Sequence, residues 1–116
     1  MSLNGIWSCE LGGAYGWEAV GTLFLKDGHL QGCGRNHYTL GTYKTKGDGA
    51  VFHMELNQYG NKRTLFGQKR EQVRVTIKAK QDGDKLIGEA TLPGRKQYGI
   101  FVRFQRRADL PEEKPH

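Results

Sequence analysis

Residues 73–86 read Val-Arg-Val-Thr-Ile-Lys-Ala-Lys-Gln-Asp-Gly-Asp-Lys-Leu. The apolar residues at positions 73, 75, 77 and 79 alternate with polar ones, and this period of two predicts a strand with one buried face. The Asp82-Gly83 pair that follows is a hairpin signal, because glycine accepts the positive φ that tight hairpin turns require. The stretch therefore predicts two antiparallel strands joined by a tight turn.

The same pattern continues along nearly the whole chain. Glycine-containing turns at 26–29, 46–49 and 93–94 also separate apolar-rich runs. The expected strands span residues 4–11, 17–26, 29–33, 38–45, 51–56, 73–80, 86–92 and 98–106. The segment 57–70 is less regular, and either a short strand at 64–66 or a loop fits it. Eight strands joined by hairpins predict an all-β fold, an antiparallel up-and-down meander that closes into a barrel.

The composition suits one small barrel domain. The chain has 116 residues, with 17 scattered glycines and 3 prolines, as expected for tight turns, bulges and barrel corners. We expect residues 1–107 to form the single barrel domain and the polar residues 108–116 to form a flexible tail. No stretch approaches the roughly 20 apolar residues of a membrane helix, and the start lacks a secretory signal. These features predict a cytoplasmic protein with no membrane partner.

Residue types with catalytic or metal-binding chemistry are scattered along the chain. The candidate nucleophiles Ser8, Cys9 and Cys33 lie in no strained strand-to-helix turn and beside no helix N-terminus. Without export, both cysteines are expected to be reduced and to pack as small core residues. His53 and Glu55 would share a strand face, but a zinc site usually needs three or four ligands. We therefore expect no enzyme, no cofactor and no metal.

Aromatic residues supply much of the expected apolar surface. We expect six of them to fill the barrel core, namely Trp7, Trp17, Phe24, Tyr38, Tyr43 and Phe52. The alternative is a partly hollow barrel that binds a small apolar ligand. The residues expected to line the pocket for that ligand are Trp7, Trp17, Phe24, Tyr43, Phe52, Val75, Ile77 and Val102.

The net charge of +6 includes residues at expected outward positions. Arg74, Lys78 and Lys80 fall on the outward face of the strand at 73–80, and Arg103 falls on that of the last strand. Basic residues with nearby aromatic side chains can bind single-stranded nucleic acid. The chain has no RNA-recognition consensus, however, so a solvated strand face is favoured. The outward apolar residues at 87 and 101 would suit a dimer interface.

The chain opens with Asn4-Gly5-Ile6-Trp7-Ser8 and continues with Gly21-Thr-Leu-Phe-Leu-Lys-Asp-Gly-His-Leu-Gln-Gly32 and Tyr38-Thr-Leu-Gly-Thr-Tyr43. These motifs, within residues 4–106, resemble the GrlR family of negative regulators of type III secretion in enteric bacteria. The resemblance implies a lipocalin-like (calycin-like) eight-stranded barrel that dimerises and has an apolar interior. It also implies repression by binding a helix-turn-helix activator protein, through a surface-exposed acidic motif.

The turn that matches this acidic motif is Lys46-Gly47-Asp48-Gly49, which retains only one acid, Asp48. Because the surface here is basic instead, an acidic protein partner is expected, or no partner of that type. Our leading interpretation is a homodimeric, non-enzymatic regulatory protein that sequesters a transcriptional activator. The expected partner contacts are the turn 46–49, the segment 57–70, Arg74, Lys78 and Arg103. The alternatives are a carrier or sensor of a small apolar ligand and a nucleic-acid-binding protein.

Overall fold

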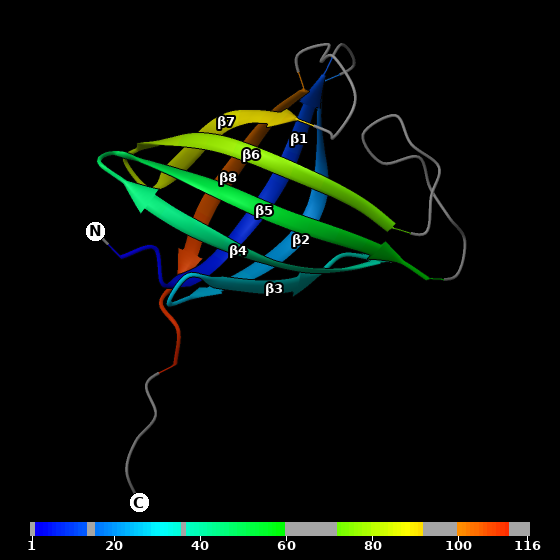
Figure 1. Ribbon diagram of the computed structural model, residues 1–116, viewed down its shortest axis with the longest axis horizontal. Helices are drawn as coiled ribbons and strands as arrows, with labels where there is room; N and C mark the ends of the chain where they lie inside the picture. The colour runs from blue at the N-terminus through cyan, green and yellow to red at the C-terminus, as the bar shows by residue number, and fades with distance from the viewer. Residues whose placement is uncertain (1, 14–15, 36, 60–71, 92–99, 112–116) are drawn as a thin grey trace, which may run out of the picture.

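The computed structural model describes residues 2–13, 16–35, 37–59, 72–91 and 100–111. The strands are β1 (Gly5–Gly13), β2 (Gly16–Lys26), β3 (His29–Cys33), β4 (His37–Lys46), β5 (Gly49–Gln58), β6 (Gln72–Asp82), β7 (Lys85–Thr91) and β8 (Ile100–Ala108). Each strand pairs antiparallel with the next, and β8 also pairs with β1, so the sheet closes into a barrel (Figure 1). The expected all-β, lipocalin-like barrel of eight strands is confirmed. The described residues include no helix long and apolar enough to cross a membrane.

The strand bounds differ slightly from those expected. β5 is two residues longer at each end than the predicted 51–56, and β8 continues to Ala108. Ala108 belongs to the barrel rather than to the expected tail, because it pairs with Ile6 of β1. The short strand considered at 64–66 lies outside the described residues, as does the turn at 93–94.

Tight hairpins join β2 to β3, β4 to β5 and β6 to β7 at one end of the barrel, which we call the turn end. Gly28, Gly47 and Gly83 in these hairpins have φ values of 84°, 60° and 63°. Gly28 and Gly83 are the glycines of Asp-Gly pairs, as predicted, whereas in the 46–49 turn the positive φ falls on Gly47 and not on Gly49 of the Asp48-Gly49 pair. The chain also enters β1 and leaves β8 at this end (Figure 1). The other strand ends lie at the opposite end of the barrel, which we call the loop end; they are Gly13 and Gly16, Cys33 and His37, Gln58 and Gln72, and Thr91 and Ile100.

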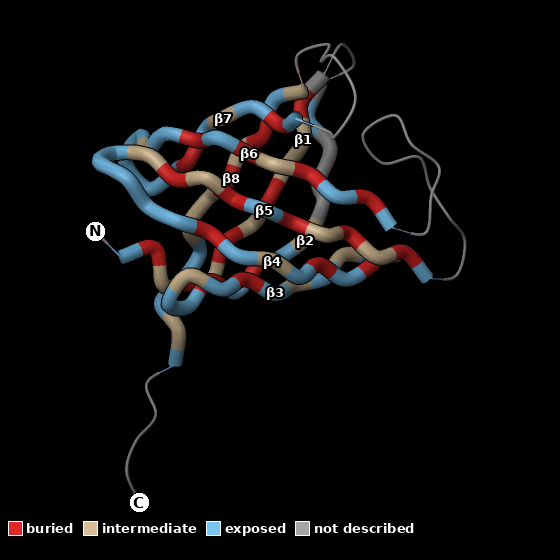
Figure 2. The backbone as a smooth tube through the Cα atoms, viewed as in Figure 1, coloured by how far each residue is buried: buried red, intermediate tan, exposed pale blue. Residues whose placement is uncertain are grey.

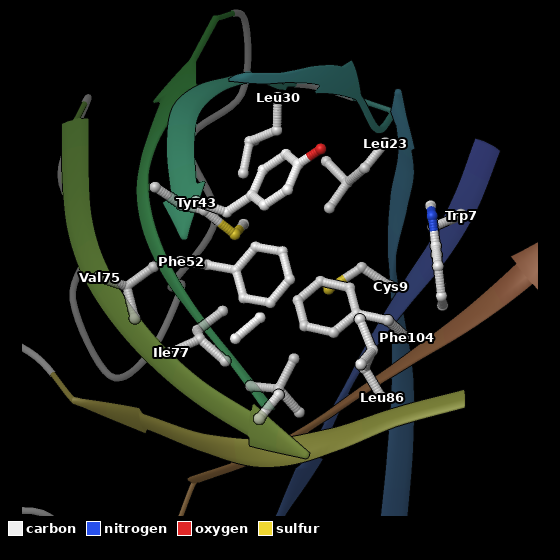
Figure 3. Close-up of a cluster of buried hydrophobic side chains, with 14 of the residues drawn as sticks. Trp7, Cys9, Leu23, Leu30, Tyr43, Phe52, Val75, Ile77, Leu86 and Phe104 are labelled. Carbon is white, nitrogen blue, oxygen red and sulfur yellow. The ribbon is translucent and has the colours of Figure 1, made fainter. Parts of the chain in front are cut away.

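Buried residues alternate with more exposed ones along the strands (Figure 2), as expected when successive side chains point into the barrel and out of it. The interior aromatic rings pack closely, with centroids 4.8 Å apart for Phe52 and Phe104 and 5.7 Å apart for Tyr43 and Phe52 (Figure 3). Of the residues expected inside, those buried in this core are Trp7, Tyr43, Phe52, Val75, Ile77 and Val102. Rings of this size contribute most of the core's buried apolar area.

The interior positions of Trp17, Phe24 and Tyr38 were predicted wrongly, because all three lie on the outer face and are 40 to 45% exposed. In the run Leu23-Phe24-Leu25, the two leucines point inward and are buried. The period of two then places Phe24 outside. Trp17 pairs in register with Gly12, and its ring lies across this glycine rather than in the core.

The turn end is closed by the residues that precede β1. Leu3 is buried, and its carbonyl accepts a hydrogen bond of 2.9 Å from Trp7 Nε1. Asn4 accepts three hydrogen bonds. One of 2.8 Å reaches its carbonyl from the Arg106 guanidinium, and two reach Oδ1, of 2.9 Å from the Asp27 backbone amide and of 3.2 Å from the Tyr43 hydroxyl. The Arg106 guanidinium carbon also lies 5.5 Å from the centroid of the Trp7 ring. These contacts link the start of β1 to β4 and β8.

Inward-facing glycines allow neighbouring strands to approach closely. A Cβ atom on Gly41 would overlap the carbonyl oxygen of His53, and one on Gly88 would overlap that of Lys78. Glycine at such sites is one way in which a sheet coils tightly enough to close. Part of the high glycine content therefore serves barrel curvature rather than turns.

Candidate functional site

A groove on the outer face of β5, β6 and β7 brings together Lys46, Asp48, Gly49 and Lys78 of the residues predicted to contact a partner. Of the predicted contact segment 57–70, residues 60–70 lie outside the described residues. The volume of the groove is about 690 Å³. The side chains along it, which define the outer groove, are Lys46, Asp48, Val51, Lys78, Lys80, Ile87, Glu89 and Thr91. Gly49 also lines it, whereas Gly47 lies beside it in the turn.

Strand register explains why distant residues meet in the outer groove. Lys78 pairs with Val51 of β5 and with Glu89 of β7. Two residues further along β6, Lys80 pairs with Gly49 of β5 and with Ile87 of β7. The β4–β5 turn is fixed against β6 by a 2.7 Å hydrogen bond that the Gln81 amide donates to the Asp48 carbonyl. The turn is therefore continuous with the basic outward side of β6.

The outer groove combines uncompensated positive charge with an apolar floor. Within the described part of the chain, Lys46, Lys78 and Lys80 make no ion pair. Two carboxylates, those of Asp48 and Glu89, line the same groove, so its ammonium groups outnumber its carboxylates. Val51 is half-buried on the floor and Ile87 is 42% exposed at the side. This arrangement suits a partner that offers carboxylates together with apolar side chains.

The structure separates Arg74 and Arg103 from the outer groove. Arg74 faces outward further along β6, with its Nε 3.7 Å from Glu55 Oε2. Both carboxylate oxygens of Glu10 accept hydrogen bonds of 3.2 Å from Arg103 Nη2. Arg103 also lies 4.1 Å from the centroid of the Trp17 ring. Glu10 compensates the charge of Arg103. Arg103 therefore stabilises the outer face of β8, β1 and β2 and does not extend the basic surface of the outer groove.

That face carries exposed aromatic surface. Phe101 of β8 pairs with Gly12 of β1, and Gly12 pairs with Trp17 of β2. The two aromatic side chains therefore lie in one row on either side of a glycine. Phe101 is 47% exposed and Ile87 is 42% exposed, so their predicted outward positions are confirmed. The homodimer for which they were considered stays a prediction.

Sequence reasoning missed polar residues in the interior at the loop end. His37, Thr39 and Gln58 are all buried there. A signal was available: counting back from Tyr43, which was expected inside, in steps of two reaches Thr39 and His37. The predicted interior instead comprised only aromatic and aliphatic residues, and His37 was not part of it.

His53 and Glu55 share an outward face of β5, as predicted, but each contacts β6. His53 Nδ1 lies 3.2 Å from Thr76 Oγ1, and Glu55 pairs with Arg74. Across the described ranges, no three His, Cys, Asp or Glu side chains gather as metal ligands would.

The two cysteines are free thiols in different environments. Cys9 is buried in the core, as expected, whereas Cys33 is exposed on the outer face, so its expected core position was wrong. In β3 the inward residue is Leu30, and the period of two places Cys33 outside. Burial, with a smaller contribution from the Glu10 charge, raises the pKa of the Cys9 thiol to about 12.

We expect a thiol reagent such as Ellman's reagent to modify Cys33 rapidly and Cys9 only as fast as the barrel opens. The thiolate is the reactive form, and Cys9 is both inaccessible and protonated at neutral pH. The measurement is the time course of labelling, with peptide mass spectrometry to identify the modified residue. Cys33→Ser should remove the fast phase entirely. A fast phase that persists in this variant would show that Cys9 is accessible in the native barrel.

No protein-family model matches this chain, and no curated protein sequence matches it significantly. The candidate site is therefore defined by its geometry and charge.

Proposed function

We propose that this barrel is a non-enzymatic binding protein that takes up an acidic segment of a regulatory protein in the outer groove. The observation that carries the proposal is the cluster of three lysines, Lys46, Lys78 and Lys80, which line one groove without ion-pair partners among the described residues. Unpaired ammonium groups on a preformed sheet attract an acidic partner and increase the rate at which it binds. Val51 and Ile87 supply the apolar contact that stabilises the complex after encounter.

The resemblance to the GrlR family supports this proposal. The proposed mechanism is sequestration, in which the barrel occupies a surface that a transcriptional activator needs for its own target. Asp48 is the remaining acid of the turn that matches the family's acidic motif, and the lysines beside it reverse the charge of that surface. We therefore propose an acidic, rather than a basic, contact segment on the activator.

We also propose that the protein acts as a homodimer. Ile87 and Phe101 lie on neighbouring strands, β7 and β8, and both are exposed. Ile87 lines the outer groove, so Phe101, on the next strand, forms the apolar edge proposed for the dimer. Two copies joined at this edge would present two outer grooves to one partner assembly, and bivalency strengthens binding when both sites can engage together.

Charge reversal in the outer groove should weaken recognition of an acidic partner. We expect the double variant Lys78→Glu, Lys80→Glu to bind a fluorescein-labelled decapeptide of alternating Glu and Leu at least about tenfold more weakly than the unmodified protein, a change equivalent to about 1.4 kcal/mol. Fluorescence anisotropy at two salt concentrations measures this, and affinity should fall as salt rises.

The matched control is Lys26→Glu, an exposed lysine at the end of β2 that does not line the outer groove. It should bind the acidic peptide as the unmodified protein does. A labelled oligothymidylate tests the nucleic-acid alternative in the same assay. Tighter binding of the oligonucleotide than of the peptide, or equal loss in the Lys26→Glu control, would contradict the proposed function.

A further inference from the structure

The start of β1 carries a pair of residues that can modify itself. Asn4-Gly5 is the one Asn-Gly pair in the sequence, and Gly5 is the first residue of β1. In a flexible chain, the backbone nitrogen that follows an asparagine can attack the side-chain carbonyl carbon. The attack is least hindered before a glycine, which has no Cβ and leaves the backbone free to turn. The sequence therefore places its asparagine most open to deamidation at the entry to the barrel.

In the folded barrel, hydrogen bonds hold the Asn4 side chain in place. Its Nδ2 donates a 3.0 Å hydrogen bond to Asp27 Oδ1, and its Oδ1 accepts one of 2.9 Å from the Asp27 backbone amide. The hydroxyl of Tyr43, whose ring lies in the core (Figure 3), donates to the same Oδ1 at 3.2 Å. We call these three residues the Asn4 latch. Attack by the Gly5 nitrogen would draw the held side chain into a ring with the backbone, so latch hydrogen bonds must break first.

The Asn4 latch fits an amide and not a carboxylate. The ionised Asp27 carboxylate can only accept hydrogen bonds, so the group that faces it must donate, as Asn4 Nδ2 does. Conversion of Asn4 to an aspartate would place two negative charges where the 3.0 Å hydrogen bond now lies. Asp27 makes no ion pair within the described part of the chain, and the Arg106 guanidinium is already paired with Asp109. A second carboxylate would therefore repel Asp27.

We propose that Asn4-Gly5 is a self-modification site, which the barrel protects while its turn end is closed and exposes when that end opens. Once the latch has opened, the Gly5 backbone nitrogen bonds to Asn4 Cγ and gives up its proton, the Cγ–Nδ2 bond breaks, and ammonia leaves. Water then opens the resulting cyclic imide at either of its carbonyls, which gives aspartate or isoaspartate. The reaction needs water alone as a co-reactant.

The modification acts in one direction. Its product carries a carboxylate in place of the Asn4 amide, so the latch cannot re-form with the ionised Asp27. The preceding residue, Leu3, is buried and accepts the hydrogen bond from Trp7 that closes the turn end, and loss of the latch loosens this closure. A barrel that has opened at this end is thereby marked permanently. The latch residues do not line the outer groove, and the site does not depend on the function proposed there.

The first test compares the full chain under folding conditions with the same chain in guanidinium chloride, at one pH and temperature. Peptide mass spectrometry measures the loss of Asn4 and the appearance of aspartate and isoaspartate at this position. We expect conversion to be at least about tenfold slower in the folded protein, because the reaction there waits for local opening. Asn4→Gln would need a larger ring and should react far more slowly in denaturant. Equal rates with and without denaturant, or equal reaction of Asn4→Gln, would overturn the proposal.

Two variants weaken the latch and leave the Asn4-Gly5 pair intact. Tyr43→Phe removes only the hydroxyl, and Asp27→Gly removes the carboxylate at a position whose φ of 50° glycine accepts. Each should speed deamidation of the folded protein about fivefold, the effect of losing roughly one hydrogen bond. His29→Ala changes an exposed residue of the same hairpin outside the latch and should leave the rate unchanged. Unchanged rates in both latch variants, with folding established by far-UV circular dichroism, would refute the protective role of the latch.

Asn4→Asp tests whether the latch excludes the product, whatever the folding of the other variants. We expect its urea midpoint to lie below that of the unmodified protein at about pH 7. The difference should shrink at about pH 4, where a proton shared by the two carboxyl groups restores a donor. Asn4→Ala loses the same hydrogen bonds without adding charge, so its difference should depend less on pH. An Asn4→Asp protein as stable as the unmodified one at about pH 7, or one whose loss is independent of pH, would overturn the one-way modification.

Discussion

Phe52→Ala is expected to lower the free energy of unfolding by about 3–5 kcal/mol, which corresponds to a fall in Tm of roughly 10–20 °C. Phe52 is fully buried and lies between the rings of Tyr43 and Phe104 (Figure 3). Truncation removes its buried area and leaves a cavity that the closed sheet cannot collapse to fill. Urea denaturation, followed by tryptophan fluorescence, gives the free energy directly.

Phe101→Ala is the matched control, because it removes the same side chain from the outer face of β8. Phe101 is about half exposed, and surface substitutions of this kind usually change stability by no more than about 0.5 kcal/mol. The comparison should be made at low protein concentration, since Phe101 belongs to the proposed dimer edge. Equal losses in the two variants would mean that the central rings do not carry the core's stability.

Gly88→Ala is expected to destabilise the barrel by about 1–3 kcal/mol, although it adds a single methyl group. The added Cβ would overlap the Lys78 carbonyl oxygen and crowd the Ala79 backbone on β6. Backbone atoms in a paired strand cannot rotate away as a side chain can, so β6 and β7 must separate locally. Hydrogen exchange should then show faster exchange of amides in the β6–β7 ladder than in the β4–β5 ladder.

Lys85→Ala is the control for Gly88→Ala, since Lys85 is an exposed residue of the same strand. Its stability should stay within about 0.5 kcal/mol of that of the unmodified protein. If Gly88→Ala proves as stable as Lys85→Ala, the close approach of β6 and β7 is not a requirement for closure.

The fold was predictable because its signals are local. Alternation at 73–79 and the Asp-Gly turns fix strand direction and hairpin pairing within short stretches of sequence. The inward face of β2 was not predictable in the same way. Leu23, Phe24 and Leu25 are three consecutive apolar residues, so hydrophobicity alone does not say which of them points inside. The register shift between Cys9 and Glu10, where β1 meets β2, is also invisible in the sequence.

The candidate site was predictable in part. The turn 46–49 and Lys78 were singled out separately, but only the pairing of β5 with β6 shows that they share one groove. Arg103 looked equivalent to Lys78 by charge and outward position. Its carboxylate partner, Glu10, lies 93 residues away in sequence. The alternation of residues within one strand does not predict an ion pair between residues so far apart. His37 was missed because a buried, unpartnered imidazole is recognised only by its surroundings.

Because β1 begins and β8 ends side by side at the turn end, the two ends of the barrel domain can be joined covalently. The two strands are hydrogen-bonded neighbours, and Ile6 pairs with Ala108. A short linker joining residues near 2 and 109 would therefore turn the polypeptide into a continuous ring that keeps every strand and the buried Leu3. Opening that ring at the exposed 47–48 turn would give a circular permutant with the same barrel. In such a permutant the new ends would emerge beside the outer groove, where a fused partner segment would be held at high effective concentration.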